Sequence, residues 1–136
     1  MPDHGRISDE DLDGETRLIS VAGAVDLYNA PDFKEAMERA LEAGRQRLVF
    51  DLSEATFIDS TVLGVIAGAS RRLRTTGGSI AIICFQPGPM RVLRISGFDR
   101  FFPICRSRDD ALRALADEPS RQAESADPDS PSGSTS

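Results

Sequence analysis

The stretch RLVFDLSEATFIDSTVLGVI, residues Arg47–Ile66, decides how this chain folds. Its first part, Leu48–Leu52, is apolar on both faces of an extended chain except for Asp51, and such a strand belongs inside a sheet that helices cover. A short loop is expected next. Asp59, Ser60 and Thr61 then stand before a helical pattern, where side-chain oxygens satisfy the free N–H groups of a first turn. The stretch therefore predicts a buried strand, a loop at the functional edge of the sheet, and a helix with a hydroxyl group at its N-terminus.

The composition limits the classes of protein to consider. The 136 residues suit one domain whose core needs neither a metal nor disulfide bonds. The 22 Asp and Glu residues outnumber the 16 Lys and Arg residues, and the net charge of -6 argues against a protein that binds nucleic acid through a broad basic surface. No segment approaches the roughly 20 apolar residues of a membrane span, and the N-terminus is polar. We therefore expect a cytoplasmic protein that is neither exported nor inserted into a membrane.

The two cysteines of the chain also indicate a cytoplasmic protein. Cys84 and Cys105 each lie in an apolar segment, and the chain has no Cys-x-x-Cys pair and no Cys/His cluster. Two reduced, buried thiols are the expected state of these residues in a cytoplasmic protein.

Strands and helices alternate along the chain, in the order β-β-α-β-α-β-α-β-α. This order predicts an α/β fold with a mixed sheet of about five strands and helices packed on the sheet. Residues 1–14 are expected to form a flexible N-terminus or an edge strand, residues 15–116 the folded domain, and residues 117–136 a disordered acidic tail rich in Ser and Pro. The clearer strands cover residues 17–23, 47–52, 79–85 and 101–105, with Pro103 indicating an edge or a bulge. The helices cover about 30–44, 60–75, 87–97 and a short segment after Ser107. Gly97 fits the C-terminal end of the third helix, and Ser107 with Asp110 resembles a capping box for the last one.

The helix that follows Asp59 has two distinct sides. One side carries an apolar stripe that faces the core: Val62, Ile66, Ala69 and Leu73. The other side carries Thr61, Gly64, Gly68 and Arg71. The absence of bulky side chains at the two glycines equally favours close packing within the domain and the approach of a partner.

Several separated motifs of the chain agree with those of one known family. In order, they are Gly23-Ala-Val-Asp26, Leu48–Leu52, Phe57–Ile66, Gly77-Gly78 before a strand, and Ile95-Ser-Gly-Phe98 before the last strand. With this order and spacing, about residues 15–116 resemble the STAS domain of bacterial anti-sigma factor antagonists, so a STAS-domain fold is expected. The family usually reads Asp-Ser-Ser/Thr-Gly-Leu-Gly, whereas this chain has Val62 in place of the first glycine.

The resemblance implies a partner-switching regulator. In that family, a kinase that is also the anti-sigma factor phosphorylates the serine after the motif aspartate, and only the dephosphorylated form binds this partner. By position, the phosphoacceptor here is Ser60. ATP would be bound by the partner, and a phosphatase would restore the active form. The implied partner-contact region contains Asp26, Asp59, Ser60, Thr61, Gly64 and Gly68.

The residues alone leave other hypotheses open. Without the resemblance, Ser60 is first of all a helix cap, and Asp26 is equally well explained as a solvated turn residue. Two further functions also remain. One is a STAS module that binds a nucleotide or small ligand at the Ser60 end, and the other is a scaffold that associates through its sheet edge or a helix face without phosphorylation.

No catalytic site is indicated. The only histidine is His4, near the N-terminus, which excludes a Ser-His-Asp triad built on Ser60. The sequence also has no phosphate-binding loop, no dinucleotide motif and no metal-ligand spacing. We therefore expect a kinase substrate that has no cofactor and no metal of its own, rather than an enzyme.

Overall fold

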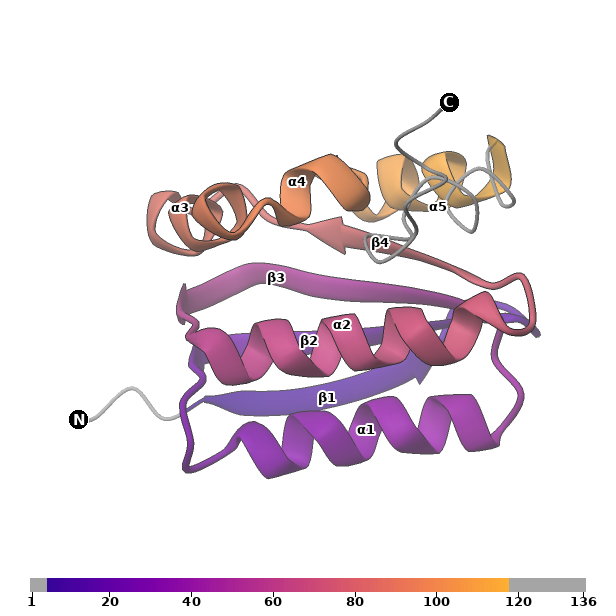
Figure 1. The fold of residues 1–136 in the computed structure, drawn as a ribbon, viewed down its shortest axis with the longest axis horizontal. Helices are drawn as coiled ribbons and strands as arrows, with labels where there is room; N and C mark the ends of the chain where they lie inside the picture. The colour runs from indigo at the N-terminus through magenta and orange to yellow at the C-terminus, as the bar shows by residue number, and fades with distance from the viewer. Residues whose placement is uncertain (1–4, 118–136) are drawn as a thin grey trace.

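The strands of the computed structural model, which describes residues 5–117, form one five-stranded sheet (Figure 1). In chain order they are β1 (Arg6–Asp11), β2 (Thr16–Ala24), β3 (Arg47–Phe57), β4 (Ser79–Ile83) and β5 (Ile104–Cys105). They lie side by side in this same order, so β3 is the central strand. Strand β1 is antiparallel to β2, and the other neighbours are parallel. The mixed five-stranded sheet predicted from the sequence is therefore confirmed.

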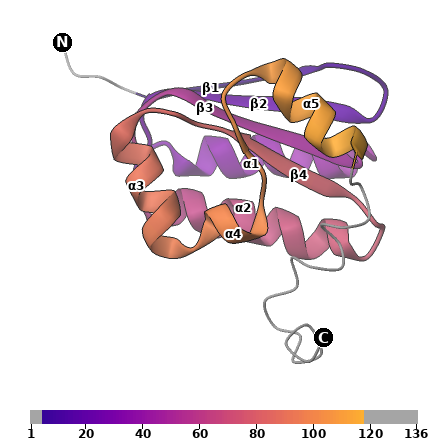
Figure 2. The same ribbon diagram turned by 90° about the horizontal axis from the view of Figure 1, so that it is seen from above.

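The helices cover both faces of this sheet, as Figures 1 and 2 show. They are α1 (Ala30–Glu42), α2 (Ser60–Arg74), α3 (Pro87–Ser96), the single turn α4 (Phe98–Phe101) and α5 (Arg108–Asp117). Helices α1 and α2 lie next to each other on one face together with α3, and α5 packs on the opposite face against β3, β4 and β5. Since parallel strands can only be joined by such crossovers, the helices follow from the strand order.

Each face of the sheet has its own core, which explains why β3 is apolar on both sides. The larger core includes the rings of Phe33 and Phe50, whose centroids are 5.5 Å apart, and it takes in the predicted stripe of α2. The smaller core, under α5, consists of Leu18, Val49, Ala81, Ile83, Cys105, Ala111 and Leu115. The buried position of the central strand predicted from its sequence is confirmed.

Strand β3 is longer than its apolar segment suggested. It continues to Phe57, and only Ile58 and Asp59 separate it from α2, so the prediction of a loop from Ser53 onward is wrong. The added residues pair with the end of β2 across a register shift, and Ala55 is fully buried there. Backbone pairing with a long neighbour therefore extends the strand beyond the point where its side chains become polar.

The segment after α3 also differs in part from the prediction. Gly97 adopts a left-handed conformation (φ 83°) and ends α3 as expected, but the next residues form the turn α4 instead of leading into a strand. The rings of Phe98 and Phe102 lie 5.5 Å apart against the larger core, which turns the chain inward. The predicted strand 101–105 is thereby reduced to Ile104–Cys105, although Pro103 correctly indicated an edge.

The opposite edge of the sheet, strand β1, is surrounded by ion pairs. Asp11 accepts a hydrogen bond from Arg17 (N–O distance 2.8 Å) and two from Arg45 (3.0 and 2.9 Å). Asp9 lies 3.6 Å from Arg17 and 3.8 Å from Arg39. Arg45 and then Arg17 hold the pKa of Asp11 well below its usual range. This edge of the sheet is therefore lined by charged side chains that pair with one another within the domain.

Some expectations concern parts of the chain outside the described residues. The predicted tail, residues 117–136, is among them except for Asp117, the last residue of α5. Within residues 5–117, no helix has the length and apolar character needed to span a membrane. Cys84 and Cys105 are free and buried, as predicted.

Candidate functional site

The ends of β2, β3 and β4 and the starts of the following helices meet at one edge of the sheet, the left-hand side of Figure 1. The N–H of Val25, just after β2, donates to the carbonyl of Phe57 at the end of β3 (N–O distance 2.9 Å). The side chain of Gln86, just before α3, donates to the carbonyl of Ser53 (3.1 Å). These bonds fix the three loops relative to one another at the edge where parallel α/β sheets gather their sites.

Helix α2 begins with Asp59 as its N-cap, so the hypothesis that Ser60 itself caps the helix is wrong. An Asp59 carboxylate oxygen accepts from the N–H of Thr61 (2.9 Å) and also from the Thr61 hydroxyl group. A carboxylate suits this position because it satisfies a free N–H group and faces the positive end of the helix dipole. Ser60 is the first helical residue, is exposed, and makes no hydrogen bond through its hydroxyl group to any of residues 5–117.

Val62, which stands where the resembled family usually has glycine, does not disturb this helix start. Its side chain is fully buried in the larger core. Its N–H group donates to the carbonyl of Asp59 (3.1 Å), as the first turn of a helix requires. The valine therefore adds apolar packing beneath Ser60 without moving it from the helix N-terminus.

The loop after β2 holds Asp26 in a defined and exposed position. One Asp26 carboxylate oxygen accepts from the N–H of Tyr28 (2.9 Å), and the Asn29 side chain accepts from the N–H of Asp26 (3.0 Å) while donating to the carbonyl of Ala24 (3.0 Å). Asn29 occupies the N-cap position of α1 but uses its side chain for this loop instead of for the helix. Asp26 is thus a turn residue whose carboxylate remains at the surface, directly after Val25, the residue that is hydrogen-bonded to the end of β3.

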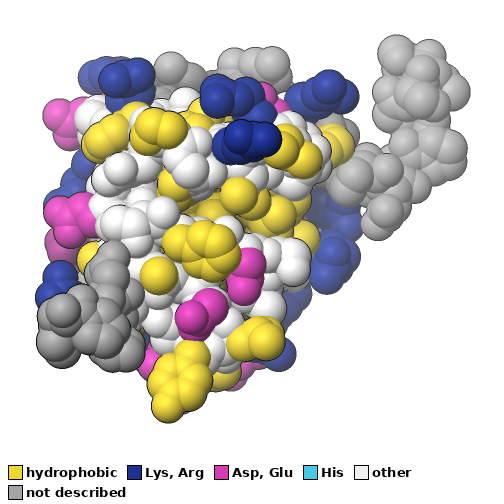
Figure 3. Space-filling view, turned by 90° about the vertical axis from the view of Figure 1, so that its left-hand side faces the viewer, with side chains coloured by type: hydrophobic (Ala, Val, Ile, Leu, Met, Phe, Trp, Pro, Cys, Tyr) yellow, Lys and Arg dark blue, Asp and Glu magenta, His cyan; other side chains and the backbone are white. Residues whose placement is uncertain are grey.

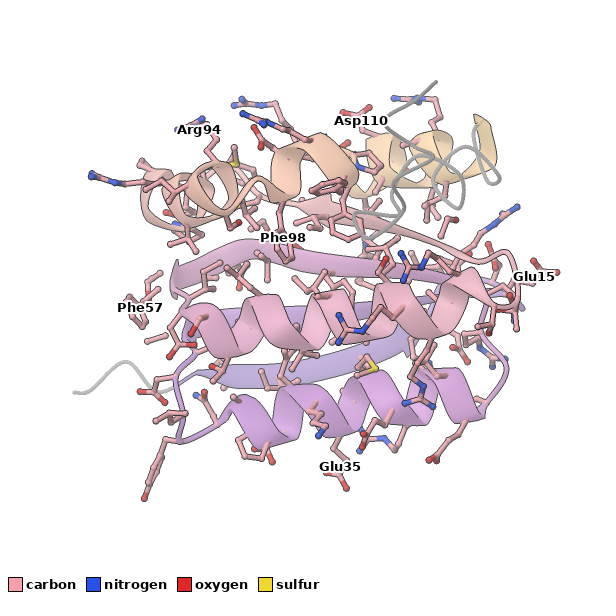
Figure 4. All side chains as sticks on the ribbon, in the orientation of Figure 1. Glu15, Glu35, Phe57, Arg94, Phe98 and Asp110 are labelled. Atoms are coloured by element: carbon pink, nitrogen blue, oxygen red, sulfur yellow. The ribbon has the colours of Figure 1, made fainter. Side chains whose placement is uncertain are left out.

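Large apolar side chains are exposed around this edge, and the sequence analysis did not identify them. Their exposed fractions are 76% for Leu27, 90% for Tyr28, 51% for Phe57 and 45% for Phe85. Figure 3, which looks at this end of the molecule, shows hydrophobic side chains gathered around acidic ones, and Figure 4 shows Phe57 projecting beyond the start of α2. Exposed apolar patches of this kind are typical of interaction sites. We call these four residues, with Asp26, Asp59 and Ser60, the docking face.

An interhelical groove of about 660 Å³ extends from the docking face between α1 and α2. One wall carries residues that were predicted to share one side of α2, and the other wall comes from α1. The lining includes Thr61, Gly64, Gly68 and Arg71 of α2 and Pro31, Lys34, Met37 and Glu38 of α1. The predicted second side of α2 is therefore confirmed, and it faces an open groove.

The two glycines of this groove are not required for packing within the domain. A Cβ atom at Gly64 would meet nothing within 4 Å, and one at Gly68 would meet only the Arg71 guanidinium group at 3.9 Å. Glycine in a helix interior costs about 1 kcal/mol relative to alanine. Of the two explanations for Gly64 and Gly68, close intramolecular packing is therefore wrong.

The site provides hydroxyl groups, carboxylates and apolar surface. Among residues 5–117, no cluster of His, Cys, Asp and Glu side chains could hold a metal ion. Burial raises the pKa of the Cys84 thiol to about 11, so this group stays protonated at neutral pH and is a poor nucleophile. The site therefore combines an exposed hydroxyl group with carboxylates and exposed apolar surface.

Comparison with known proteins identifies the family. The model of the STAS domain matches residues 9–111. The chain belongs to the STAS domain family. A STAS-domain containing protein from Pseudomonas aeruginosa is 32% identical to this STAS domain over 92 residues, which are 68% of this chain and 90% of the relative.

Relatives with more specific names are also similar to this STAS domain. The anti-sigma-B factor antagonist of Listeria monocytogenes is 35% identical over 86 residues, covering 63% of this chain and 75% of the relative. The crystal structure of an anti-sigma factor antagonist from Mycobacterium paratuberculosis superimposes with a TM-score of 0.77 at 30% identity, covering 85% of this chain and 97% of the other. The family and the fold expected from the sequence motifs are thereby confirmed.

Proposed function

We propose that this STAS domain is an anti-sigma factor antagonist that phosphorylation of Ser60 switches off. In its unphosphorylated form it binds an anti-sigma factor that is also a serine kinase, and this binding releases a sigma factor. The similarity to named antagonists supports the proposal. The observation that carries it is the exposed Ser60 hydroxyl group, which has no hydrogen-bond partner among residues 5–117 and lies within the apolar docking face.

A phosphate group on Ser60 would act on the partner and leave the fold in place. Negative charge at the first residue of α2 is compatible with the helix, because free N–H groups and the positive end of the helix dipole face it. The modification adds a charge of about -1.5 to -2 next to the carboxylate of Asp59. A partner surface that had accepted a neutral hydroxyl group there would meet charge repulsion and a desolvation cost.

The other residues of the docking face have supporting roles. Asp26 and Asp59 supply polar contacts, and the four apolar side chains supply the area that an interface needs at its centre. Thr61, Gly64 and Gly68 continue the contact along α2. The STAS domain itself supplies no catalytic group and no cofactor; ATP arrives with the kinase, and a phosphatase reverses the modification. We also place the protein in the cytoplasm, which its two free cysteines favour.

A kinase assay with the natural partner tests this function. The full chain is used to capture its anti-sigma factor from the native host, and the purified pair is incubated with ATP and Mg²⁺. Tandem mass spectrometry should find one phosphate on Ser60, none on the Ser60→Ala variant, and unchanged modification of Thr61→Ala. A phosphate on Thr61, or on no residue, would overturn the assignment. Titration of the STAS domain with ATP alone tests the alternative that it is a nucleotide-binding module.

A further inference from the structure

The interhelical groove has a distribution of charge that differs from that of the whole chain. Three cations line it, Lys34 of α1 and Arg71 and Arg72 of α2, against one carboxylate, Glu38, so the groove is net positive on a chain of net charge -6. Both arginines are exposed, and they belong to the last turn of α2, where cations also complement the helix dipole. The groove therefore changes along its length, from an uncharged end at Leu27 and Thr61 to a basic end at Arg71 and Arg72.

The dimensions of the groove suit a helix of the partner. Its floor is lined by Val65 and Met37 and is open above Gly64 and Gly68, where no side chain blocks the approach of a backbone. The distance along α2 from Thr61 to Arg72 is 11 residues, or about 16 Å at 1.5 Å per residue, which is three helical turns. A groove of this length with an apolar floor is the usual receptor for an amphipathic helix.

The basic end lies far enough from Ser60 to be electrically separate from it. Ser60 and Arg71 are also 11 residues apart on one helix, again about 16 Å. This separation is twice the screening length of about 8 Å at physiological ionic strength. A phosphate on Ser60 would therefore have little effect on an ion pair at Arg71 or Arg72.

We propose that the groove binds a helix of the anti-sigma factor, with the apolar stripe of that helix on Val65 and Met37 and its Asp or Glu residues paired with Arg71 and Arg72. This inference rests on the proposed function and adds a second contact to it, one that phosphorylation of Ser60 does not control. The partner is thus held at two places, and phosphorylation of Ser60 switches binding off by acting on the first of them. Charge complementarity selects an acidic helix, because the groove has three cations and one carboxylate.

Charge reversal at the basic end tests the proposal by isothermal titration calorimetry with the captured anti-sigma factor. The Arg71→Glu/Arg72→Glu double variant should raise Kd at least tenfold. The matched control, Arg94→Glu/Arg100→Glu, makes the same change of charge on α3 and α4 and should alter Kd less than threefold; Figure 4 shows Arg94 pointing away from the layer of α1 and α2. Equal effects of the two pairs would overturn the inference.

Combination with Ser60→Asp tests whether the two contacts are independent. The fold-increase in Kd caused by Arg71→Glu/Arg72→Glu should be the same in the wild-type and Ser60→Asp backgrounds, as expected for sites more than about 10 Å apart. If the charge reversal has no effect once Ser60 is replaced by Asp, the groove is not a separate contact. If wild-type protein binds no anti-sigma factor at all, the proposed function fails; binding that is present but insensitive to the groove variants overturns only the present inference.

Filling the groove gives a second test that does not depend on charge. Gly68→Leu should keep or raise the melting temperature, because leucine favours a helix more than glycine does, and yet it should raise Kd at least tenfold. Glu35→Leu is the control: it places the same side chain on an exposed position of α1 that Figure 4 shows pointing away from α2. Light scattering checks that the variant stays monomeric, and normal affinity of a folded, monomeric Gly68→Leu variant would contradict the proposal.

Discussion

One oxygen of the Asp59 carboxylate accepts hydrogen bonds from both the backbone N–H group (2.9 Å) and the hydroxyl group of Thr61. The two residues on either side of Ser60 are thus hydrogen-bonded to each other. The Thr61 hydroxyl group is occupied within the helix cap, whereas that of Ser60 is directed to no described residue. This arrangement gives a structural distinction between two adjacent hydroxyl groups, in addition to their positions in the motif.

The Asp59 cap should be measurable as stability. Asp59→Ala removes the acceptor for the Thr61 N–H group, so the free energy of unfolding should fall by about 1 kcal/mol. Asp59→Asn keeps an oxygen acceptor and should lose clearly less. Urea unfolding followed by circular dichroism gives both values. Equal losses for the two variants would show that the hydrogen bond is not what Asp59 contributes.

Ser60→Asp should separate folding from binding. Because Ser60 is the first residue of α2 and not its cap, the substitution leaves the Asp59–Thr61 bonds in place and adds charge where the helix dipole tolerates it. The melting temperature should change little, while affinity for the anti-sigma factor should fall at least tenfold, about 1.4 kcal/mol. Calorimetry with Ser60→Ala as the uncharged control checks this. A folded Asp variant that binds like the wild type would mean that charge at this site is not the switch.

Asp26→Asn should affect the partner and not the fold. Asparagine retains an oxygen that can accept from the N–H group of Tyr28, so the turn is preserved while the charge is lost. Thermal unfolding should be nearly unchanged, as for most surface substitutions, and binding or phosphorylation by the kinase should weaken. A large loss of stability together with normal binding would assign Asp26 to the structure of the loop.

The Cys84 thiol should make the protein sensitive to alkaline pH. Burial raises its pKa from 9.0 to about 11, so the folded state keeps a proton that the unfolded state has released. The resulting stability is fully present below pH 9 and is lost as pH rises from 9 to 11. The urea midpoint should therefore fall across this range, and the fall should be smaller in Cys84→Ala, whatever the cost of the cavity. An identical pH dependence of the two proteins would show that Cys84 does not contribute to it.

Sequence patterns predicted the structure correctly where a residue type in a given pattern has one usual structural role. The left-handed Gly97 ends α3, the stripe of Val62, Ile66, Ala69 and Leu73 faces the core, and Ser107 accepts a hydrogen bond from the N–H group of Asp110 at the start of α5, all as predicted. Periodicity and capping are local properties, so they can be read from neighbouring residues.

The predictions that were wrong concern features that depend on contacts between distant segments of the chain. The length of β3 depends on pairing with β2, and the turn α4 depends on the packing of Phe98, so neither is encoded in the local pattern. The exposure of Tyr28 and Phe57 depends on which loops share the sheet edge, and apolar residues in a sequence are normally assigned to a core. The sequence analysis therefore identified polar residues of the docking face, such as Asp26 and Ser60, but not its apolar residues.

The two margins of the sheet limit how this domain can recognise other chains. Four of the six residues of β1 are charged, and β5 is only two residues long and follows Pro103, which has no N–H group to offer. Neither edge suits the addition of a strand from another molecule. This argues against a scaffold that associates through its sheet edge. Recognition must then depend on side chains, and the information that distinguishes one anti-sigma factor from another lies in the loops and helix faces, which can change during evolution without altering the sheet. Paralogous regulators in one cell could thus keep a common framework while remaining insulated from each other's partners.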